Sequence, residues 1–216
     1  MLDPYVRTLI DPPLHTVGKS LAKLGVSPST LTLSGFGVGL LAMGAIIHHY
    51  YLTAALLILI NRLLDGLDGA VARNTAQSDF GGVLDISCDF IVYSGIVFAF
   101  GLSDPENTFY AAFLIFSFIG PITTFLAYAI VAAKHQINTT RRGIKSFYHL
   151  GGICEGTETA LLLLIICLFP ESFPWAAMVF GTLCWLTTIG RLYRAYIDFA
   201  EVYNLPLAET LVKNRQ

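Results

Sequence analysis

Charged side chains are scarce in this chain of 216 residues, and their scarcity excludes a soluble globular domain. Asp, Glu, Lys and Arg together make up 13% of the residues, whereas a soluble domain has about 25%. Too few polar side chains remain to cover a globule of this size. The formal net charge of −2 also provides no basic surface for nucleic acid, so we expect no nucleic-acid partner.

Cysteine is equally sparse, and its spacing excludes a zinc site or a disulfide framework. The four cysteines are scattered, no two form a CxxC pair, and they are Cys88, Cys154, Cys167 and Cys184. We expect them to be buried thiols. What the chain has in excess is apolar residues, which make up 55% of the sequence and give a mean hydropathy of +0.65. This composition predicts an integral membrane protein.

Six apolar runs are candidates for membrane-spanning helices, since a helix needs about 20 residues to cross the hydrocarbon core of a bilayer. The runs are Leu31–Ile47, Tyr51–Leu64, Val83–Leu102, Phe109–Ala133, Ile153–Phe169 and Trp175–Leu192. The second run is short, and we expect its helix to continue through Arg73. The predicted fold class is therefore an all-α integral membrane protein with six transmembrane helices.

An amphipathic cytoplasmic surface helix is predicted ahead of the first span, within residues 1–30. Apolar residues recur there at helical spacing: Leu14, Val17, Leu21 and Leu24. Lys19 and Lys23 lie on another side of this helix. The alternative is a helix packed against the bundle. Residues 31–200 are then expected to form one transmembrane catalytic domain, and residues 201–216 a cytoplasmic tail.

The positions of the basic residues predict the topology. All thirteen Lys and Arg residues precede the first run, flank the junction of the second and third, occupy the fourth-to-fifth loop, or lie towards the C-terminal end. The loops at 48–50, 103–107 and 170–174 contain none. Because basic residues are retained in the cytoplasm, both termini are predicted to be cytoplasmic.

Four aspartates lie where a membrane protein rarely has any. Asp65 and Asp68 end the second span, while Asp85 and Asp89 lie in the third. Spacings of three and four residues place each pair on one helix face. If these faces meet, four carboxylates converge at the cytoplasmic edge of the membrane. Oxygen ligands of this kind suit Mg²⁺ or Mn²⁺, and four carboxylates suit two bridged ions.

Two further residues indicate that the site binds a diphosphate. Gly69 leaves room for a ligand close to the backbone, and Arg73 lies four residues later on the same helix face. A guanidinium there can bind a phosphate through two hydrogen bonds. The plainer alternative is an interfacial helix end for the first aspartate pair, and a salt bridge to Arg62 or Arg73 for the second.

The order of these residues resembles the signature of a known enzyme family. D-x-x-D-G-x-x-A-R runs from Asp65 to Arg73 and G-x-x-x-D-x-x-x-D from Gly81 to Asp89, so eight fixed positions fall within 25 residues. This order is similar to that of the CDP-alcohol phosphotransferases, a six-span family of phospholipid-synthesising enzymes. The sequence P-S-T-L-T at residues 28–32 resembles the P-N-x-x-T segment of the family, although by itself it also fits a helix start.

The resemblance implies a reaction and a role for each aspartate. In the family, metal ions hold the diphosphate of a CDP-linked lipid while an alcohol attacks the β-phosphorus and CMP leaves. Asp65 and Asp85 would bridge two Mg²⁺ or Mn²⁺ ions. Asp68 would complete the first metal site and Asp89 the second, and Asp89 would also be the general base.

The resemblance also implies residues for the lipid donor and the alcohol acceptor. A donor such as CDP-diacylglycerol would be bound by Ser29, Thr32, Gly69, Arg73 and Ser78. Arg141, Arg142 and Lys145 are candidates for binding a phosphorylated acceptor. Alternatively, this loop only marks the cytoplasmic side or binds anionic membrane lipids. A homodimer is expected from the family.

The start of the fifth span bears on the acceptor. In the branch of the family that uses inositol phosphate we expect an arginine near Glu155, where this chain has Gly156 and Thr159. Glu155 and Glu158 are candidates for binding acceptor hydroxyls or for pairing with the loop arginines.

Two other functions compete with this one. An intramembrane prenyltransferase also binds Mg²⁺ and a lipid diphosphate through aspartate-rich motifs, and Asn61 faintly resembles the start of its first motif. However, the Gly69–Arg73 pattern is not typical of that class. A cation or proton transporter would also bury carboxylates, but at mid-depth and in several helices.

Overall fold

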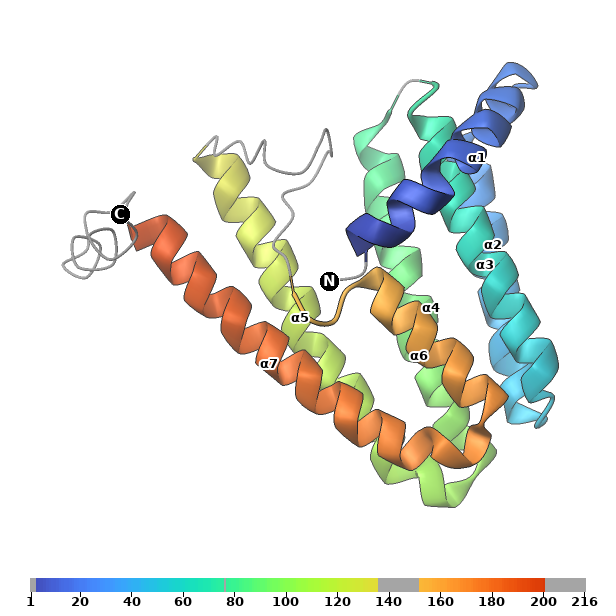
Figure 1. Ribbon diagram of the computed structural model, residues 1–216, viewed down its shortest axis with the longest axis vertical. Helices are drawn as coiled ribbons and strands as arrows, with labels where there is room; N and C mark the ends of the chain where they lie inside the picture. Colours follow the sequence, from blue (N-terminus) through green and yellow to red (C-terminus); the bar gives the residue numbers. More distant parts are fainter. Residues whose placement is uncertain (1–2, 76, 136–151, 201–216) are drawn as a thin grey trace.

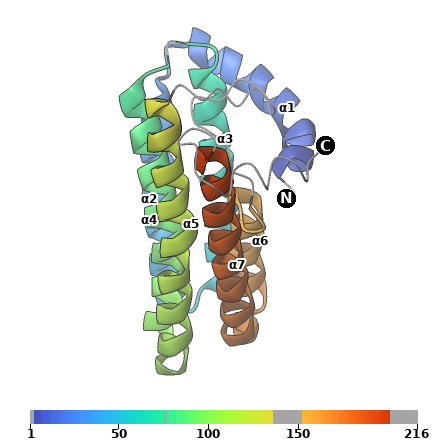
Figure 2. The same cartoon turned by 90° about the vertical axis from the view of Figure 1, so that its left-hand side faces the viewer.

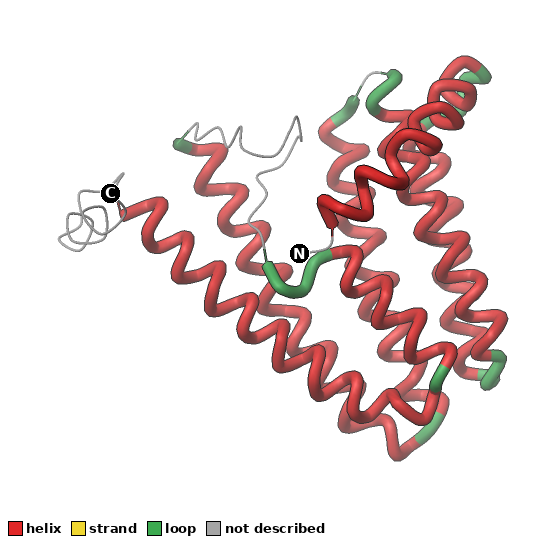
Figure 3. Tube along the Cα trace, viewed as in Figure 1, coloured by secondary structure: helices red, strands yellow, loops and turns green. Residues whose placement is uncertain are grey.

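The chain is a bundle of α-helices in a computed structural model, which describes residues 3–75, 77–135 and 152–200. Short loops and two 3₁₀ turns join the helices, and no strand occurs within those ranges (Figure 3). The helices are α1 (Asp3–Lys23), α2 (Pro28–Ile47), α3 (Tyr51–Ala72), α4 (Asp79–Ser103), α5 (Thr108–Lys134), α6 (Gly156–Leu168) and α7 (Phe173–Ala200).

Four of the described helices, α2, α4, α5 and α7, are long and apolar enough to cross a membrane. The all-helical membrane fold is thereby confirmed. The expected continuation of the second span is also present, because α3 is one helix from Tyr51 to Ala72. By contrast, α6 has 13 residues and is therefore about 20 Å long, less than the ~30 Å of a hydrocarbon core. The count of six spans stays a prediction.

The loops without Lys or Arg lie at one end of the bundle. These are the short connections α2–α3, α4–α5 and α6–α7, at the bottom of Figure 1. The α3–α4 junction and the C-terminal ends of α5 and α7 lie at the opposite end, which α1 crosses. The two sets of segments are therefore separated as the charge pattern predicts, while the side that faces the cytoplasm stays a prediction.

Helix α1 packs against α3 on one side. Leu14 is buried, and a Cβ at Gly66 would lie 2.8 Å from its Cδ1. A Cβ at Gly18 would lie 2.6 Å from that of Ala70, so glycine permits this close approach. Val17, however, is 48% exposed. One side of α1 is therefore packed against the bundle, which is the alternative that the sequence left open. Figure 2 shows this helix crossing the end of the bundle.

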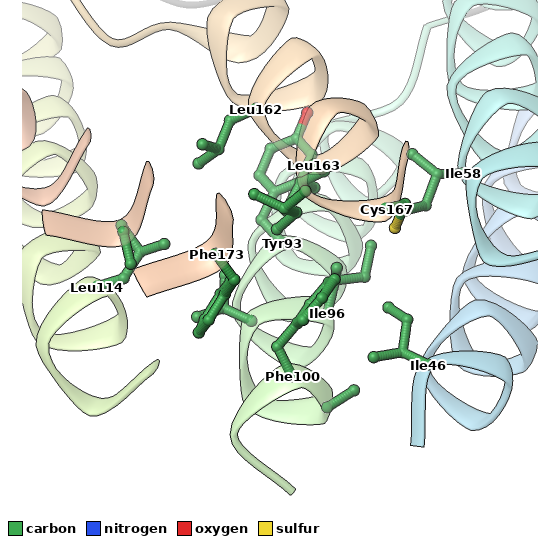
Figure 4. Packing of buried hydrophobic residues seen from close by; sticks show 14 of the residues in the cluster. Ile46, Ile58, Tyr93, Ile96, Phe100, Leu114, Leu162, Leu163, Cys167 and Phe173 are labelled. Atoms are coloured by element: carbon green, nitrogen blue, oxygen red, sulfur yellow. The ribbon is translucent and has the colours of Figure 1, made fainter. Parts of the chain in front are cut away.

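The core cluster contains residues of all the helices from α2 to α7 (Figure 4). Phe100 stacks on Phe173 with ring centroids 4.7 Å apart. Leu163 and Ile166 of α6 are fully buried in the same cluster, so this short helix is held along its length. Three of the four thiols are also buried, as the sequence predicts, and they are Cys154, Cys167 and Cys184. The prediction was wrong for Cys88, which is only half-buried because it lines the pocket between α2, α3 and α4.

Helices α2 and α4 approach each other closely at Gly39. A Cβ at this position would lie 2.6 Å from Cγ2 of Val92, a buried side chain whose branched Cβ restricts its rotamers. Small residues allow such approaches in membranes, where no hydrophobic effect drives helices together. Val92 lies three residues beyond Asp89, so this contact fixes the distance of the aspartates of α4 from α2.

Candidate active site

Three of the four predicted aspartates meet between α3 and α4. Asp65, Asp68 and Asp85 each offer a carboxylate oxygen, and the three oxygens lie within 4.8 Å of one another. The helix faces thus converge as the spacings predict. Beside the oxygens lies a pocket of about 10 Å³, room for roughly one water-sized sphere. Other residues that line the pocket are Thr32, Gly35, Phe36, Asn61, Cys88, Asp89 and Val92.

The donor set of this cluster fits a divalent cation. Its ligand atoms are all carboxylate oxygens, which Mg²⁺ and Mn²⁺ prefer over softer metals. Asp68 is 4% exposed, so its charge is poorly solvated. Three negative charges this close repel one another strongly unless a cation compensates them. The cluster can therefore hold a metal ion.

Asp89 lines the same pocket but is paired with an arginine. Nη2 of Arg62 donates to Oδ1 of Asp89 at 2.7 Å, while Nη1 of Arg62 lies 3.5 Å from Oδ2 of Asp65. Of the two arginines considered from the sequence, Arg62 forms this salt bridge. The second aspartate pair is therefore divided: Asp85 joins the cluster, and Asp89 is paired with the guanidinium of Arg62.

Thr32 contacts a predicted metal ligand directly. Its hydroxyl donates to Oδ2 of Asp68 at 2.6 Å, and the threonine is buried at 8% exposure. The resemblance places this residue near the nucleotide, whereas its described contact is with the aspartate. Ser29 is half-buried in the first turn of α2, and Pro28 is the first residue of this helix, as expected for a helix start.

The other predicted donor-binding residues lie at the α3–α4 junction. A Cβ at Gly69 would approach only Nη1 of Arg73, at 3.4 Å, so the backbone there is open on one side. Arg73 is exposed at the end of α3. Ser78 is the N-cap of α4, and its hydroxyl accepts the backbone N–H of Gly81 at 3.0 Å. An open backbone beside an exposed guanidinium suits a diphosphate.

The acceptor candidates Arg141, Arg142 and Lys145 lie outside the described residues. The two glutamates that follow have a local role which the sequence left undecided. Glu155 and Glu158 form a capping box at the start of α6, in which each side chain accepts the backbone N–H of the other residue. Their carboxylates thus stabilise the N-terminus of this helix.

Arg191 is a candidate site residue that the sequence prediction missed. It is 8% exposed within α7, its Nη1 donates to the carbonyl of Pro121 at 2.8 Å, and its guanidinium lies 5.9 Å from the centroid of Phe125. Its Nε has no hydrogen-bond partner among the described residues. The available signal was a basic residue inside an apolar span, which is costly and hence a functional candidate.

A pocket of about 290 Å³ lies between α5 and α7, with Arg191 in its wall. The pocket wall also contains two hydroxyls and one phenol, from Thr123, Thr124 and Tyr128. The rest of the wall is apolar: Ala127, Val131, Leu192, Ala195 and Phe199. A buried cation next to hydroxyl groups suits an anionic, hydroxyl-bearing ligand.

Comparison with known proteins gives this geometry its context. Residues 26–190 match the family model for CDP-alcohol phosphatidyltransferase, which includes the whole aspartate motif. The chain belongs to this family. The resemblance carried by Asp65–Asp89 is thereby confirmed, and the prenyltransferase and transporter interpretations give way to it.

Two relatives align with this chain over almost its full length. The inner membrane protein YnjF of Escherichia coli (strain K12) is 49% identical over 198 residues, which are 91% of this chain and 96% of YnjF. An archaetidylinositol phosphate synthase of Pyrococcus horikoshii is 29% identical over 194 residues, covering 88% and 94% of the two chains. The chain is thus a membrane protein similar to proteins of phospholipid synthesis.

A solved structure shows the same fold. The crystal structure of Mycobacterium tuberculosis phosphatidylinositol phosphate synthase (PgsA1) with CDP-DAG bound matches with a TM-score of 0.67. The match covers 85% of this chain and 93% of PgsA1 at 18% sequence identity. The helical arrangement of the CDP-alcohol phosphatidyltransferase family is therefore present here.

Proposed function

We propose that this protein transfers a substituted phosphate group, such as a phosphatidyl group, from a CDP-linked lipid to a small alcohol and releases CMP. The observation that carries the proposal is the convergence of Asp65, Asp68 and Asp85 within 4.8 Å, with Asp89 in the same pocket. The bound CDP-DAG in the PgsA1 structure supports a CDP-linked lipid, for example CDP-diacylglycerol, as the donor.

The aspartate cluster would hold two ions of Mg²⁺ or Mn²⁺. Asp65 and Asp85 would serve both ions, Asp68 the first and Asp89 the second. When bound, such ions neutralise negative charge on a diphosphate and on its transferring phosphoryl group. The hydroxyl of Thr32 orients the carboxylate of Asp68 through the 2.6 Å hydrogen bond.

The donor is bound at the end of α3 and the start of α4. The guanidinium of Arg73 and the open backbone at Gly69 bind the diphosphate, which removes it from water and aligns it. Ser29 and Thr32 of α2 and Ser78 lie on the nucleotide side. Because the rest of these helices is apolar, the acyl chains of the donor remain in the bilayer.

Transfer is an in-line displacement at phosphorus. The oxygen of the acceptor hydroxyl forms a bond to the β-phosphorus, and the bond from that phosphorus to the oxygen shared with CMP breaks. CMP leaves with the electron pair of that bond. The hydroxyl proton passes to the carboxylate of Asp89, which acts as the general base.

The acceptor is a small alcohol, and a set of basic residues favours one that carries a phosphate. Arg141, Arg142 and Lys145 are the candidates from the sequence, and Arg191 adds a buried guanidinium whose Nε lacks a described partner. Two relatives are named as synthases of inositol phosphate lipids. The lack of an arginine near Glu155 favours a different acceptor, such as glycerol 3-phosphate.

Release of CMP by the purified protein in detergent tests this function. CDP-diacylglycerol and Mg²⁺ are supplied with glycerol 3-phosphate, inositol, inositol phosphate or serine in separate reactions. We expect release with one acceptor and none after chelation of the metal. Folded protein that releases no CMP with any of the four acceptors contradicts the proposal for CDP-diacylglycerol.

We also propose six spans, with both termini and the aspartate site in the cytoplasm, α1 on the membrane surface in contact with lipids, and a homodimer. The separation of the loops without basic residues at one end of the bundle supports the topology. Single-cysteine labelling should reach residues 104–107 from outside and Arg141→Cys from inside. The reverse result contradicts the topology, and a monomer in native mass spectrometry contradicts the dimer.

A further inference from the structure

The guanidinium of Arg62 is hydrogen-bonded through all three of its nitrogens. Nε donates to Oδ1 of Asn61 at 2.8 Å, and Nη2 donates to the same oxygen at 2.6 Å and to Oδ1 of Asp89 at 2.7 Å. Nη1 donates to the hydroxyl of Tyr93, whose ring centroid lies 4.7 Å from the guanidinium carbon. A planar guanidinium bonded in this way has one orientation.

The partners of Arg62 extend this orientation to neighbouring helices. Asn61 is buried, and its Nδ2 donates to the carbonyl of Gly35 in α2 at 2.8 Å. Asp89 and Tyr93 are four residues apart and share one face of α4. A continuous set of hydrogen bonds therefore joins α2, α3 and α4 at the wall of the aspartate pocket. Polar networks of this kind are rigid when their members are satisfied.

Arg62 is bound more closely to Asp89 than to the other aspartates for which a contact is described. It donates to Asp89 at 2.7 Å but is 3.5 Å from Asp65, and the three oxygens that lie within 4.8 Å of one another belong to Asp65, Asp68 and Asp85. The positive charge of Arg62 therefore compensates the negative charge of Asp89 more closely than that of Asp65. A carboxylate held through Oδ1 still has Oδ2 as an acceptor.

We propose that Arg62 is a positioning residue: it holds Oδ1 of Asp89, so that Oδ2 of this carboxylate stays available to take the acceptor proton. The role rests on the proposed function, because it concerns the general base of that reaction. The competing explanation is that Arg62 only ties α3 to α4. The two explanations differ in what removal of the guanidinium does to metal affinity.

Two measurements on the variant Arg62→Met and on the wild-type protein distinguish the positioning role from a purely structural one. The first is steady-state CMP release, in which kcat should fall about 100-fold while KM for the CDP-linked lipid stays within about threefold. The second is Mn²⁺ binding by electron paramagnetic resonance without substrate. Affinity should rise about tenfold, since a positive charge beside the carboxylates is lost. Slower turnover with tighter Mn²⁺ binding is not the result of a weakened fold.

Two further variants control this experiment. Arg62→Lys keeps the charge but cannot reproduce the fork of hydrogen bonds, so wild-type Mn²⁺ affinity with an intermediate kcat is expected. This variant also decides the matter if Arg62→Met does not fold, since full kcat in Arg62→Lys would overturn the need for the fork. Arg194→Met is the matched control, because Arg194 also pairs with an aspartate, Asp198, at 3.0 Å but is exposed on α7. It should leave both measurements unchanged.

The failures are distinguishable. Wild-type kcat in Arg62→Met, or a Mn²⁺ affinity that falls together with kcat, overturns the positioning role and leaves the proposed function intact. A wild-type protein that binds Mn²⁺ but releases no CMP overturns the proposed function, and with it the role of Asp89 as a base.

Discussion

Arg62 and Arg191 both lie inside an apolar bundle, but their surroundings differ. Arg62 is hydrogen-bonded through all three nitrogens and pairs with Asp89 at 2.7 Å. Arg191 donates Nη1 to the carbonyl of Pro121, while its Nε has no hydrogen-bond partner among the described residues. A buried donor without a partner costs free energy of about 1–3 kcal/mol.

The difference indicates a division of labour between two regions. Around Arg62, between α2, α3 and α4, the polar groups satisfy one another, so this region is organised before a substrate binds. Around Arg191, between α5 and α7, a donor and a pocket of about 290 Å³ remain for a ligand. We infer that the first region performs the phosphoryl transfer and that the second selects the acceptor.

The largest expected effect concerns the cluster in the first region. Asp85→Asn should lower CMP release by about 10³-fold or more, because the residue would serve both metal ions. Chelation of the metal should have the same effect on the wild-type protein. CMP release is measured at saturating CDP-linked lipid and Mg²⁺. Substantial activity in Asp85→Asn would remove the two-metal assignment.

The next effect separates a base from a ligand. Asp89→Asn keeps an oxygen in place but cannot take a proton, so turnover should fall about 10²- to 10⁴-fold. Affinity for the CDP-linked lipid should survive, since under the proposed function Gly69, Arg73 and the cluster would still bind its diphosphate. Donor affinity and turnover are compared at saturating Mg²⁺. If donor affinity and turnover fall equally, Asp89 acts only as a metal ligand, and another residue is the base.

A smaller effect is expected in the second region. Arg191→Met should raise KM for the acceptor about 10- to 100-fold, because the charge-assisted hydrogen bonds of the guanidinium to the acceptor would be lost. KM for the CDP-linked lipid and the affinity for Mn²⁺ should not change, because the described residues that line the aspartate pocket all belong to α2, α3 and α4. Arg194→Met, three residues along the same helix, is the control. A change confined to donor KM would break the division between the regions.

The smallest effect sharpens the account of the first region. Tyr93→Phe removes one acceptor of Arg62 but leaves the bonds to Asn61 and Asp89, so kcat should fall only about threefold, as for one lost hydrogen bond. The measurement is the same CMP assay used for Arg62→Met. A fall as large as in that variant would transfer the positioning role from the salt bridge to the phenol.

The sequence predicted the aspartate cluster because spacing on a helix is local. Three- and four-residue intervals fix which side chains share a face, and Asp65, Asp68 and Asp85 do meet. The family motif from Asp65 to Asp89 could also be read from the sequence, and it predicted the reaction. The salt-bridge partner of Asp89 could not be predicted from the sequence, because Arg62 and Arg73 were both candidates. The choice depends on how α3 and α4 align along their axes, which is set by packing.

Other parts of the site depended on contacts distant in sequence. The hydrogen bond from Thr32 to Asp68 joins residues 36 positions apart, and no local pattern indicates it. Glu155 and Glu158 had the spacing of a capping box, but the usual N-cap is Ser, Thr, Asp or Asn. Arg191 was counted for topology only. Its burial results from the packing of α7 on α5, which periodicity alone does not specify.

The close approach at Gly39 also limits which substitutions the site tolerates. A side chain at this position would push α4 away from α2, and Asp85 and Asp89 would move with α4. Shrinking Val92 alone would leave a void beside the pocket that this residue lines. A larger residue at Gly39 therefore requires a smaller side chain at Val92 to keep the helices at this distance. The described lining of the pocket at Arg191 comes from α5 and α7 and shares no residue with the aspartate pocket, so we expect a substitution there to alter acceptor binding while the aspartates keep their places.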